Sequence, residues 1–203
     1  RSAERIPLLG TASQQNRELA PGLVFADRLV DLCEEGIDVA VRIGGTEPLA
    51  TSLGCKRLGR EKMVLCASPA WLNAHGRPQT VEELLQHQAI LYERVDGSVK
   101  PWLFVTEDNH PHWRTVPFRM ALGDVDAQIQ AVCAGLGVAQ SPTWLIRKQL
   151  AAGELEIVLP ELQPDGLPLT LVWPRRKQLL PKVDALLNAL SALDIAGPTH
   201  EGL

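Results

Sequence analysis

Apolar positions in residues 27–36 recur with the spacing of one helical face, and polar residues fill the remaining positions. This pattern predicts a short helix. Asp27 is a candidate N-cap residue, and Gly36 is a candidate for the residue that ends the helix. The residues that share the apolar face lie at i, i+1, i+3 and i+4, namely Leu29, Val30, Leu32 and Cys33.

The pattern changes after Gly36. Residues 37–43 are rich in β-branched side chains and predict a buried strand. A helix, a glycine and a strand in this order form the closing half of a βαβ unit. Gly44 and Gly45 then open a loop at the carboxyl end of the strand, which is the edge where open α/β sheets bind ligands.

The rest of the chain alternates between apolar runs typical of strands and amphipathic segments typical of helices. Further strands are predicted over 23–25, 54–58, 62–67, 88–93, 102–106, 113–118, 137–140, 155–159 and 167–173. Helices are predicted over 3–19, 69–75, 125–134, 142–153 and 179–193, and another begins at Thr80. This order, with a hairpin inserted over 102–118, predicts an α/β fold built as two lobes.

Two helix starts carry clear capping signals. Ser68 precedes Pro69, which favours an N-cap followed by proline in the first turn. Thr80 is followed by Glu83, which is the spacing of a capping box.

Composition narrows the classes of function. The chain has 203 residues and a formal net charge of −4, so it is a poor candidate for binding nucleic acid by itself. A basic cluster at Lys56, Arg57, Arg60 and Lys62 is interrupted by Leu58, Gly59 and Glu61, and we interpret it as a solvated strand face.

The four cysteines, Cys33, Cys55, Cys66 and Cys133, contain no C-x-x-C pair, and three of them lie in apolar contexts. We expect those three to be small core residues in a reducing, cytoplasmic protein. No apolar run approaches about 18 residues, so no membrane span is expected. No signal peptide is recognised, and a chain that begins at Arg1 is expected to have lost its natural start.

Candidate sites for cofactors and metals have simpler explanations. Gly135 and Gly137 follow a helix and precede a strand, whereas a dinucleotide-binding turn needs the reverse order, so Gly135 is better explained as a helix terminator. His110 and His112 lack a third metal ligand at a suitable spacing. We therefore expect neither a cofactor nor a metal.

Two short segments are candidates for ligand contacts. Ser141 follows a strand and precedes Pro142, so it is expected to cap the next helix and to lie at the ligand edge of the sheet. Asp124 is expected to cap the helix that follows it, and Asp126 adds a second carboxylate. Neither Ser68 nor Ser141 lies in a G-x-S-x-G motif, so no catalytic serine is predicted.

Four stretches carry a family resemblance. They are residues 27–45, 65–76, 134–142 and 150–160, and they occur in the order and spacing of the effector-binding domain of LysR-type transcriptional regulators. The chain resembles that domain over roughly residues 4–195. Compared with the family, it is expected to lack the amino-terminal DNA-binding domain and the first strand.

The resemblance implies a type II periplasmic-binding-protein-like fold, in which two Rossmann-like lobes are joined by two crossover strands. The expected crossings are residues 64–68 and 171–174. Lobe I would then hold residues 1–66 with 174–203, and lobe II would hold residues 67–173. Arg42, which the related subgroup shares, is expected to be structural.

The resemblance also implies a function without catalysis. A small-molecule effector would bind between the lobes, and the domain would form a homodimer or homotetramer in which the helix over 3–19 packs against the helix over 125–134. DNA would be bound only through the missing helix-turn-helix, and no membrane contact is expected. The expected ligand contacts are Ala26, Asp27, Ile43, Gly44, Gly45, Asp124, Val125, Asp126, Gln140 and Ser141.

Two other functions remain open from the sequence. A free-standing two-lobed solute-binding protein would have the same architecture, although it would need a secretory history. An enzyme on this fold would need a nucleophile–base pair, a metal set or a phosphate loop, and no such motif is recognised in the sequence.

Overall fold

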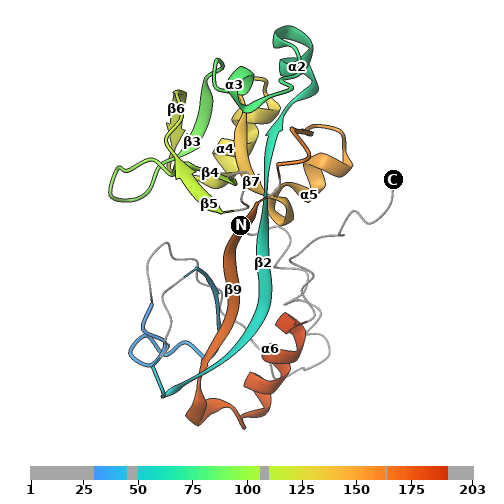
Figure 1. Cartoon of the computed structure of the whole chain (residues 1–203). Helices are drawn as coiled ribbons and strands as arrows, with labels where there is room; N and C mark the ends of the chain where they lie inside the picture. Colours follow the sequence, from blue (N-terminus) through green and yellow to red (C-terminus); the bar gives the residue numbers. More distant parts are fainter. Residues whose placement is uncertain (1–29, 45–49, 106–109, 163, 192–203) are drawn as a thin grey trace. The chain divides into compact units, whose positions relative to one another are not determined.

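The computed structural model describes residues 30–44, 50–105, 110–162 and 164–191. Internal contacts divide the chain into two compact units (Figure 1). The described part of unit 1 comprises residues 30–44, 50–60 and 167–191. The described part of unit 2 comprises residues 61–105, 110–162 and 164–166.

Unit 1 is a small antiparallel sheet with a helix packed on it. Strand β1 (Ala40–Ile43) pairs antiparallel with β9 (Asp165–Pro174), and β9 lies between β1 and β2 (Leu53–Ala67) in the sheet order. A 3-10 turn, η1 (Arg175–Lys177), leads into α6 (Pro181–Ser191). The core consists of Leu171, Trp173 and Val183, with Val39, Val41, Leu58, Leu187 and Leu190 packed around them.

The segment before β1 forms a turn over residues 32–36 where a helix was predicted. Asp31 Oδ1 accepts hydrogen bonds from the backbone N–H groups of Cys33 at 2.8 Å and Glu34 at 3.0 Å, so Asp31 caps this turn. Gly36 ends it at φ +71°, as predicted. Leu32 is buried, but Cys33 is exposed, so the prediction of Cys33 on the apolar face was wrong. The expected cap Asp27 and Leu29 lie outside the described residues.

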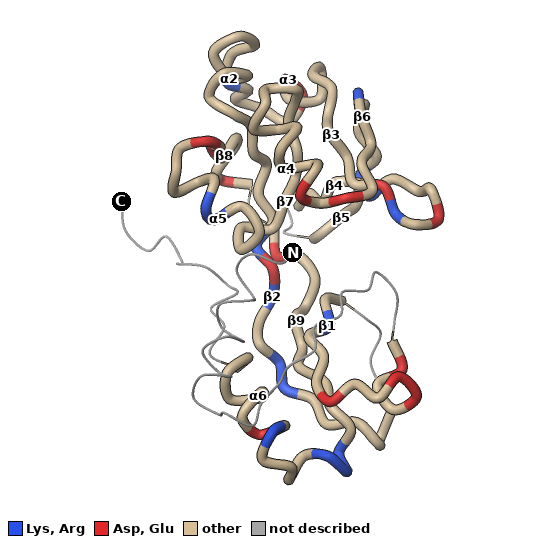
Figure 2. The backbone as a smooth tube through the Cα atoms, turned by 180° about the vertical axis from the view of Figure 1, so that it is seen from behind, with Lys and Arg blue, Asp and Glu red and all other residues tan. Residues whose placement is uncertain are grey.

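Strand β2 is a single strand of 15 residues, whereas the sequence predicted two strands separated at residues 59–61. Gly59 has φ +147°, a backbone conformation that residues with a side chain rarely adopt, and no atom lies within 4 Å of the place a Cβ would take. The glycine thus lets the strand continue where the sequence suggested a break. The exposed residues Lys56, Arg57 and Arg60 lie on β2, as expected for a solvated strand face (Figure 2).

Unit 2 contains a mixed sheet whose strands come from distant parts of the chain. The second half of β2 lies between β7 (Ala139–Pro142) and β8 (Glu156–Val158), and both pair with it antiparallel. Strand β3 (Ala89–Tyr92) pairs parallel with β6 (Phe118–Leu122). A parallel bridge between Ala89 and Val138 connects these two groups of strands.

The predicted hairpin is present in unit 2, but its strands are shorter than expected and the second strand begins two residues earlier, at Pro111. Strand β4 (Trp102–Val105) pairs antiparallel with β5 (Pro111–Arg114). The side chains of β4 contribute Trp102 and Phe104 to the core cluster that also contains Trp71 and Leu91.

The described part of unit 2 also contains four helices, namely α2 (Pro69–His75), α3 (Val81–Leu84), α4 (Val125–Cys133) and α5 (Thr143–Ala151). Ser68 caps α2 by accepting from Trp71 N at 3.3 Å, as predicted. Thr80 Oγ1 accepts from Glu83 N at 3.1 Å, but the Glu83 carboxylate reaches back to Gln79 N, one residue earlier than a capping box requires.

The chain passes between the two units twice. It enters unit 2 along β2 between residues 60 and 61 and returns along β9 between residues 166 and 167. The family resemblance had implied passages at 64–68 and 171–174, later in each strand. The lobe boundaries built on those passages stay predictions.

Candidate functional site

The carboxyl ends of β3, β6 and β7 lie at one edge of the unit 2 sheet, because the contacts from β3 to β6 and to residue 138 are parallel. Helix α4 follows β6 through Gly123 and Asp124, and α5 follows β7 directly. Two helix N-termini therefore begin at the edge where α/β sheets bind ligands. We call it the carboxyl edge and define it by residues 61, 124–126 and 140–144.

The N-terminus of α4 is already capped. Asp124 Oδ1 accepts a hydrogen bond from Ala127 N at 2.8 Å, which confirms the predicted cap. Val125 is partly buried and packs against the core cluster of Val64, Ile90 and Ile129. Asp124 and Asp126 are exposed, so this end of the carboxyl edge presents two carboxylates.

Ser141 does not cap α5, which corrects the sequence-based expectation. It is 2% exposed and pairs with Val64 in the β2–β7 ladder, and its hydroxyl is hydrogen-bonded to Cys66. The N-cap residue is Pro142, whose side chain has no polar atom. Side chains alternate between the two faces of a strand, so residue 141 faces the interior and the helix starts one residue later.

The start of α5 therefore lacks a side-chain cap. Its first residue, Thr143, has a buried Oγ1 atom with no hydrogen-bond partner in the described part of the chain. Uncapped N–H groups at a helix N-terminus attract negative charge, because the peptide dipoles add along the helix. This end of the carboxyl edge thus differs from the start of α4, which Asp124 caps.

A buried carboxylate lies beside this helix start. Glu61 is 3% exposed, and its Oε1 accepts a hydrogen bond from Trp144 Nε1 at 3.3 Å. Gly166 packs against it so closely that an added Cβ would lie 2.9 Å from Glu61 Cβ. Buried carboxylates are rare unless they are paired or hydrogen-bonded, so this arrangement is a built polar feature of the carboxyl edge.

Gln140 has both ends of its side-chain amide engaged. Its Oε1 accepts from Leu103 N at 2.7 Å, and its Nε2 donates to Leu103 O at 2.7 Å. This pair of bonds imitates the pairing of a neighbouring strand and ties β4 to β7. A ligand that used the Gln140 side chain would have to displace one of these bonds.

The predicted contacts in unit 1 follow β1. Ile43 ends this strand and is 40% exposed. Gly44 has φ +75° and donates from its N–H to Pro168 O at 2.8 Å, and a Cβ would meet Leu167 at 3.2 Å. Glycine suits this position because it tolerates the positive φ and because a side chain would have little room beside Leu167. Ala26, Asp27 and Gly45 lie outside the described residues.

Arg42 has a structural partner in unit 1. Its Nη2 donates to Val30 O at 3.0 Å, which ties β1 to the start of the preceding turn. The Asp31 carboxylate accepts backbone N–H bonds from Glu34 and Cys33 and also feels the positive charge of Arg42, and these interactions lower the pKa of Asp31. This contact agrees with the structural role that the sequence suggested for Arg42.

The cysteines are less buried than predicted. Cys66 is buried and Cys133 is half-buried, whereas Cys33 and Cys55 are exposed, so the expectation of three core cysteines was wrong. Burial raises the pKa of Cys66 to about 12, and the neighbouring Cys133 adds to the effect. Burial also raises the pKa of Cys133. Both groups are therefore thiols at neutral pH.

Sequence reasoning missed Glu61, Thr143 and Trp144 as features of the carboxyl edge. The local signal for Glu61 pointed to an exposed residue within a basic cluster, because its burial depends on Trp144 and Gly166, which are distant in sequence. Thr143 is the first residue of α5, one position after the helix start that the sequence predicted.

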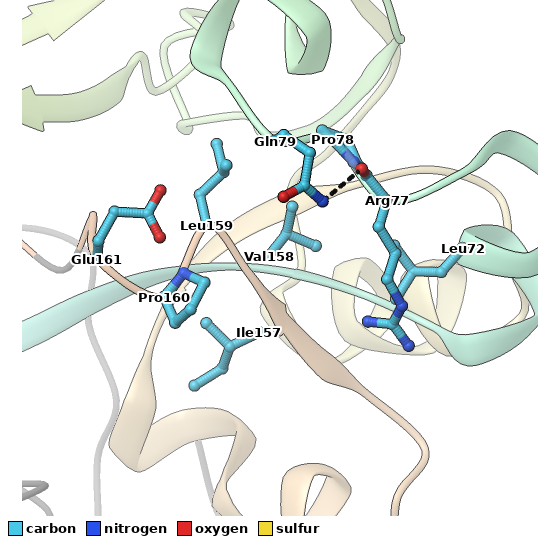
Figure 3. A pocket seen from close by; sticks show the side chains of 9 residues that line it. All are labelled: Leu72, Arg77, Pro78, Gln79, Ile157, Val158, Leu159, Pro160 and Glu161. Atoms are coloured by element: carbon cyan, nitrogen blue, oxygen red, sulfur yellow. Dashed lines mark hydrogen bonds between the residues drawn. The ribbon is translucent and has the colours of Figure 1, made fainter. Parts of the chain in front are cut away.

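A shallow pocket of about 130 Å³ lies elsewhere in unit 2, lined by Leu72, residues 77–79 and residues 157–161 (Figure 3). None of the predicted ligand contacts lines it. The described residues contain no group of three or more metal-binding side chains. No helix within them is long and apolar enough to cross a membrane.

Curated relatives of this chain include transcriptional regulators. The uncharacterized HTH-type transcriptional regulator YhjC of Escherichia coli is 32% identical over 168 residues, which cover 82% of this chain and 55% of that protein. The HTH-type transcriptional activator AaeR of E. coli is 30% identical over 175 residues, covering 85% and 55%. The chain thus spans about half the length of these relatives.

Solved structures of regulatory proteins share the fold. Full-length AphB, the virulence activator of Vibrio cholerae, has a TM-score of 0.78 at 22% identity, covering 94% of this chain and 63% of that chain. The regulatory domain of CrgA from Neisseria meningitidis has a TM-score of 0.76 at 24% identity, covering 93% and 90%. The chain therefore has the type II periplasmic-binding-protein-like α/β fold that the sequence predicted.

The family profile matches nearly the whole chain. The profile of the LysR substrate binding domain covers residues 5–194. Together with the regulators among the curated relatives, this match identifies an effector-binding regulatory domain and does not favour a free-standing solute-binding protein. The chain belongs to the LysR substrate-binding domain family.

Proposed function

We propose that this domain binds a small-molecule effector at the carboxyl edge of unit 2 and thereby changes the activity of a dimeric or tetrameric LysR-type regulator. The domain itself has no catalytic role in this proposal. DNA is contacted through an amino-terminal helix-turn-helix, as the names of the relatives suggest for those proteins. A regulator that acts on DNA in this way works in the cytoplasm.

The observation that carries the site is the uncapped start of α5. The Thr143 hydroxyl is buried without a partner, and such a group costs about 1–3 kcal/mol unless something bonds to it. An anionic group of the effector would accept a hydrogen bond from this hydroxyl, and the helix dipole would favour its negative charge. The buried position makes this bond stronger than it would be in water.

The start of α4, at the other end of the carboxyl edge, favours a group on the effector that is not negatively charged. Asp124 occupies the N-terminus of α4 with its own carboxylate, and Asp126 adds negative charge nearby. Two like charges about 4 Å apart repel by about 1 kcal/mol in water and by several kcal/mol in a partly dry site. An amine or amide therefore suits the start of α4. The effector's anionic group would bond to Thr143 at the start of α5, against the repulsion of the buried Glu61 carboxylate beside it.

The other predicted contacts belong to the same proposal. Ala26, Asp27, Ile43, Gly44 and Gly45 stay predicted ligand contacts of unit 1, and Val125, Gln140 and Ser141 would act mainly by supporting the carboxyl edge. Self-association would pair the segment 3–19 of one copy with α4 of another. Sedimentation that shows only monomer at high protein concentration would contradict this pairing.

The test of the site is Thr143→Val, which keeps the shape of the side chain and removes the hydroxyl. The apo protein should keep its free energy of unfolding or gain up to about 1 kcal/mol, because an unpaired buried hydroxyl is lost. The affinity for a carboxylate effector, found by calorimetric screening of monocarboxylates and amino acids, should fall about tenfold, which corresponds to about 1.4 kcal/mol.

A matched control is Thr115→Val, which removes an exposed threonine hydroxyl in the same unit. This variant should bind the effector as the wild type does. Effector binding that Thr143→Val leaves unchanged would show that the start of α5 is not the anion site.

A further inference from the structure

The pocket beside β8 is separate from the carboxyl edge. Its apolar base is formed by Leu72 of α2 and by residues 157–159 at the end of β8, and one side is formed by the loop 77–79 that follows α2. Strand β8 pairs with β2, and in Figure 3 the loop 77–79 passes beside it. Arg77 in this loop and Glu161 after β8 place opposite charges around a small apolar floor.

Leu159 makes the backbone of this pocket unusual. It is the only described residue other than glycine with a positive φ, at +51°. It also precedes Pro160, and a following proline favours an extended backbone with negative φ. The side chain is 4% exposed and belongs to the core cluster of Leu72 and Val158, so packing holds this conformation in place. Backbone strain of this kind clusters at ligand-binding sites.

The polar groups lie at opposite ends of the pocket. Figure 3 shows Arg77 at one end and Glu161 at the other, with Val158 and Leu159 between them. Arg77 Nη2 is paired with Glu156 Oε2 at 2.6 Å, which fixes the guanidinium while its other N–H groups remain available as donors. Gln79 donates from Nε2 to Arg77 O at 3.1 Å, so its Oε1 is an acceptor beside the floor.

We propose that this pocket is a second ligand site, which binds a small zwitterion with a carboxylate and an amine separated by a short aliphatic chain. The carboxylate pairs with Arg77, the amine pairs with Glu161 and Gln79 Oε1, and the chain lies over Leu159. An apolar cavity of about 150 Å³ holds a molecule the size of benzene, so a pocket of about 130 Å³ suits a ligand of similar size. This site is separate from the proposed effector site, so an experiment that disproves one proposal leaves the other unaffected.

The probe is 5-aminopentanoate, titrated into the 15N-labelled chain and followed by amide chemical shifts. Saturable shifts should appear in residues 77–79 and 157–162, with millimolar affinity because both charged side chains are exposed. Pentanoate and 1-aminopentane, which each carry one of the two charges, should bind at least about tenfold more weakly.

Two variants test which side chain binds each end of the ligand. Arg77→Gln should weaken 5-aminopentanoate about tenfold, and Glu161→Gln should weaken it while leaving the weak binding of pentanoate unchanged. The matched control is Glu156→Gln, which removes the ion pair of Arg77 without altering the residues that line the pocket. It should bind 5-aminopentanoate as well as the wild type or better.

Three results would overturn the proposal. They are the absence of saturable shifts, shifts that centre on the carboxyl edge, and equal affinities of the wild type and Arg77→Gln for 5-aminopentanoate. Because Arg77 and Glu161 are exposed, their substitution leaves the core intact, and the amide spectrum of each free variant reports its folding directly.

Discussion

At the scale of single residues, close packing in unit 1 leaves room only for glycine at some positions. Gly54 on β2 is buried against the indole of Trp173, and an added Cβ would lie 2.5 Å from Trp173 Cε2. Trp173 is held in the core and donates from Nε1 to Gln178 Oε1 at 3.4 Å. The ring has little freedom to move away, because protein cores are close-packed.

Gly54→Ala should therefore destabilise the protein by about 1–3 kcal/mol and shift the tryptophan fluorescence, because the indole must move. Gly36→Ala is the control for backbone strain alone. Its φ is +71° and no atom lies within 4 Å of an added Cβ, so it should cost about 1–2 kcal/mol without changing the fluorescence.

A double-mutant cycle separates steric conflict from other causes in Gly54→Ala. In the Trp173→Phe background, the smaller ring leaves room, and Gly54→Ala should cost clearly less than in the wild type. Additive effects of the two substitutions in urea unfolding would contradict the steric explanation.

At the scale of elements, one aspartate joins three segments of unit 1. Asp38 Oδ1 accepts from Lys177 Nζ at 2.7 Å, and its Oδ2 accepts from Lys182 Nζ at 2.7 Å. Lys177 also donates to Gly36 O at 3.4 Å. Partial burial acts to raise the pKa of Asp38, but the hydrogen bonds and charges of the two lysines outweigh it and lower this pKa.

The lowered pKa makes the contribution of Asp38 dependent on pH. The unfolded pKa is near 3.8, and the folded pKa is lower, so the stabilisation is fully present above about pH 4 and is lost as the pH falls through the folded value. Asp38→Asn should reduce the free energy of unfolding by about 1 kcal/mol at pH 7, discounted for partial exposure. The difference from wild type should shrink towards pH 3.

The control is Asp184→Asn, which removes an exposed carboxylate from the first turn of α6 in the same unit. Its effect at pH 7 should be smaller, because Asp184 forms no lysine pair like that of Asp38 in the described structure. A difference between wild type and Asp38→Asn that stays constant from pH 7 to pH 3 would contradict the linkage argument.

At the scale of the whole chain, charge and length set what this domain does alone. The net charge is −4, and the chain covers about half of its HTH-type relatives. The basic residues of β2 are interrupted along the strand, and Lys62 is paired with Asp165. Specific DNA affinity requires a concentrated basic surface and contacts to base edges.

This chain by itself should therefore show no specific, nanomolar binding to DNA from upstream of its own gene. Fluorescence anisotropy at low and physiological salt measures this, with a scrambled fragment of equal length as the control. Tight binding that weakens steeply with salt and prefers the upstream fragment would contradict the prediction.

The sequence alone determined the features that depend on neighbouring residues. The caps at Ser68 and Asp124, the end of the turn at Gly36 and the hairpin of β4 and β5 all follow from local patterns, and the structure has each of them. The four family motifs also predicted the α/β fold, because their order reflects the order of strands and helices.

Only the tertiary structure decided which side chains at the carboxyl edge face inward. Ser141 looked like a cap but lies in the interior, because β7 pairs with β2 and places residue 141 opposite Val64. The continuity of β2, the amide bonds of Gln140 and the burial of Glu61 likewise depend on partners distant in sequence. A local pattern specifies a residue's conformation, but it cannot specify which distant segment will cover it, and that choice determines the polar groups available to a ligand.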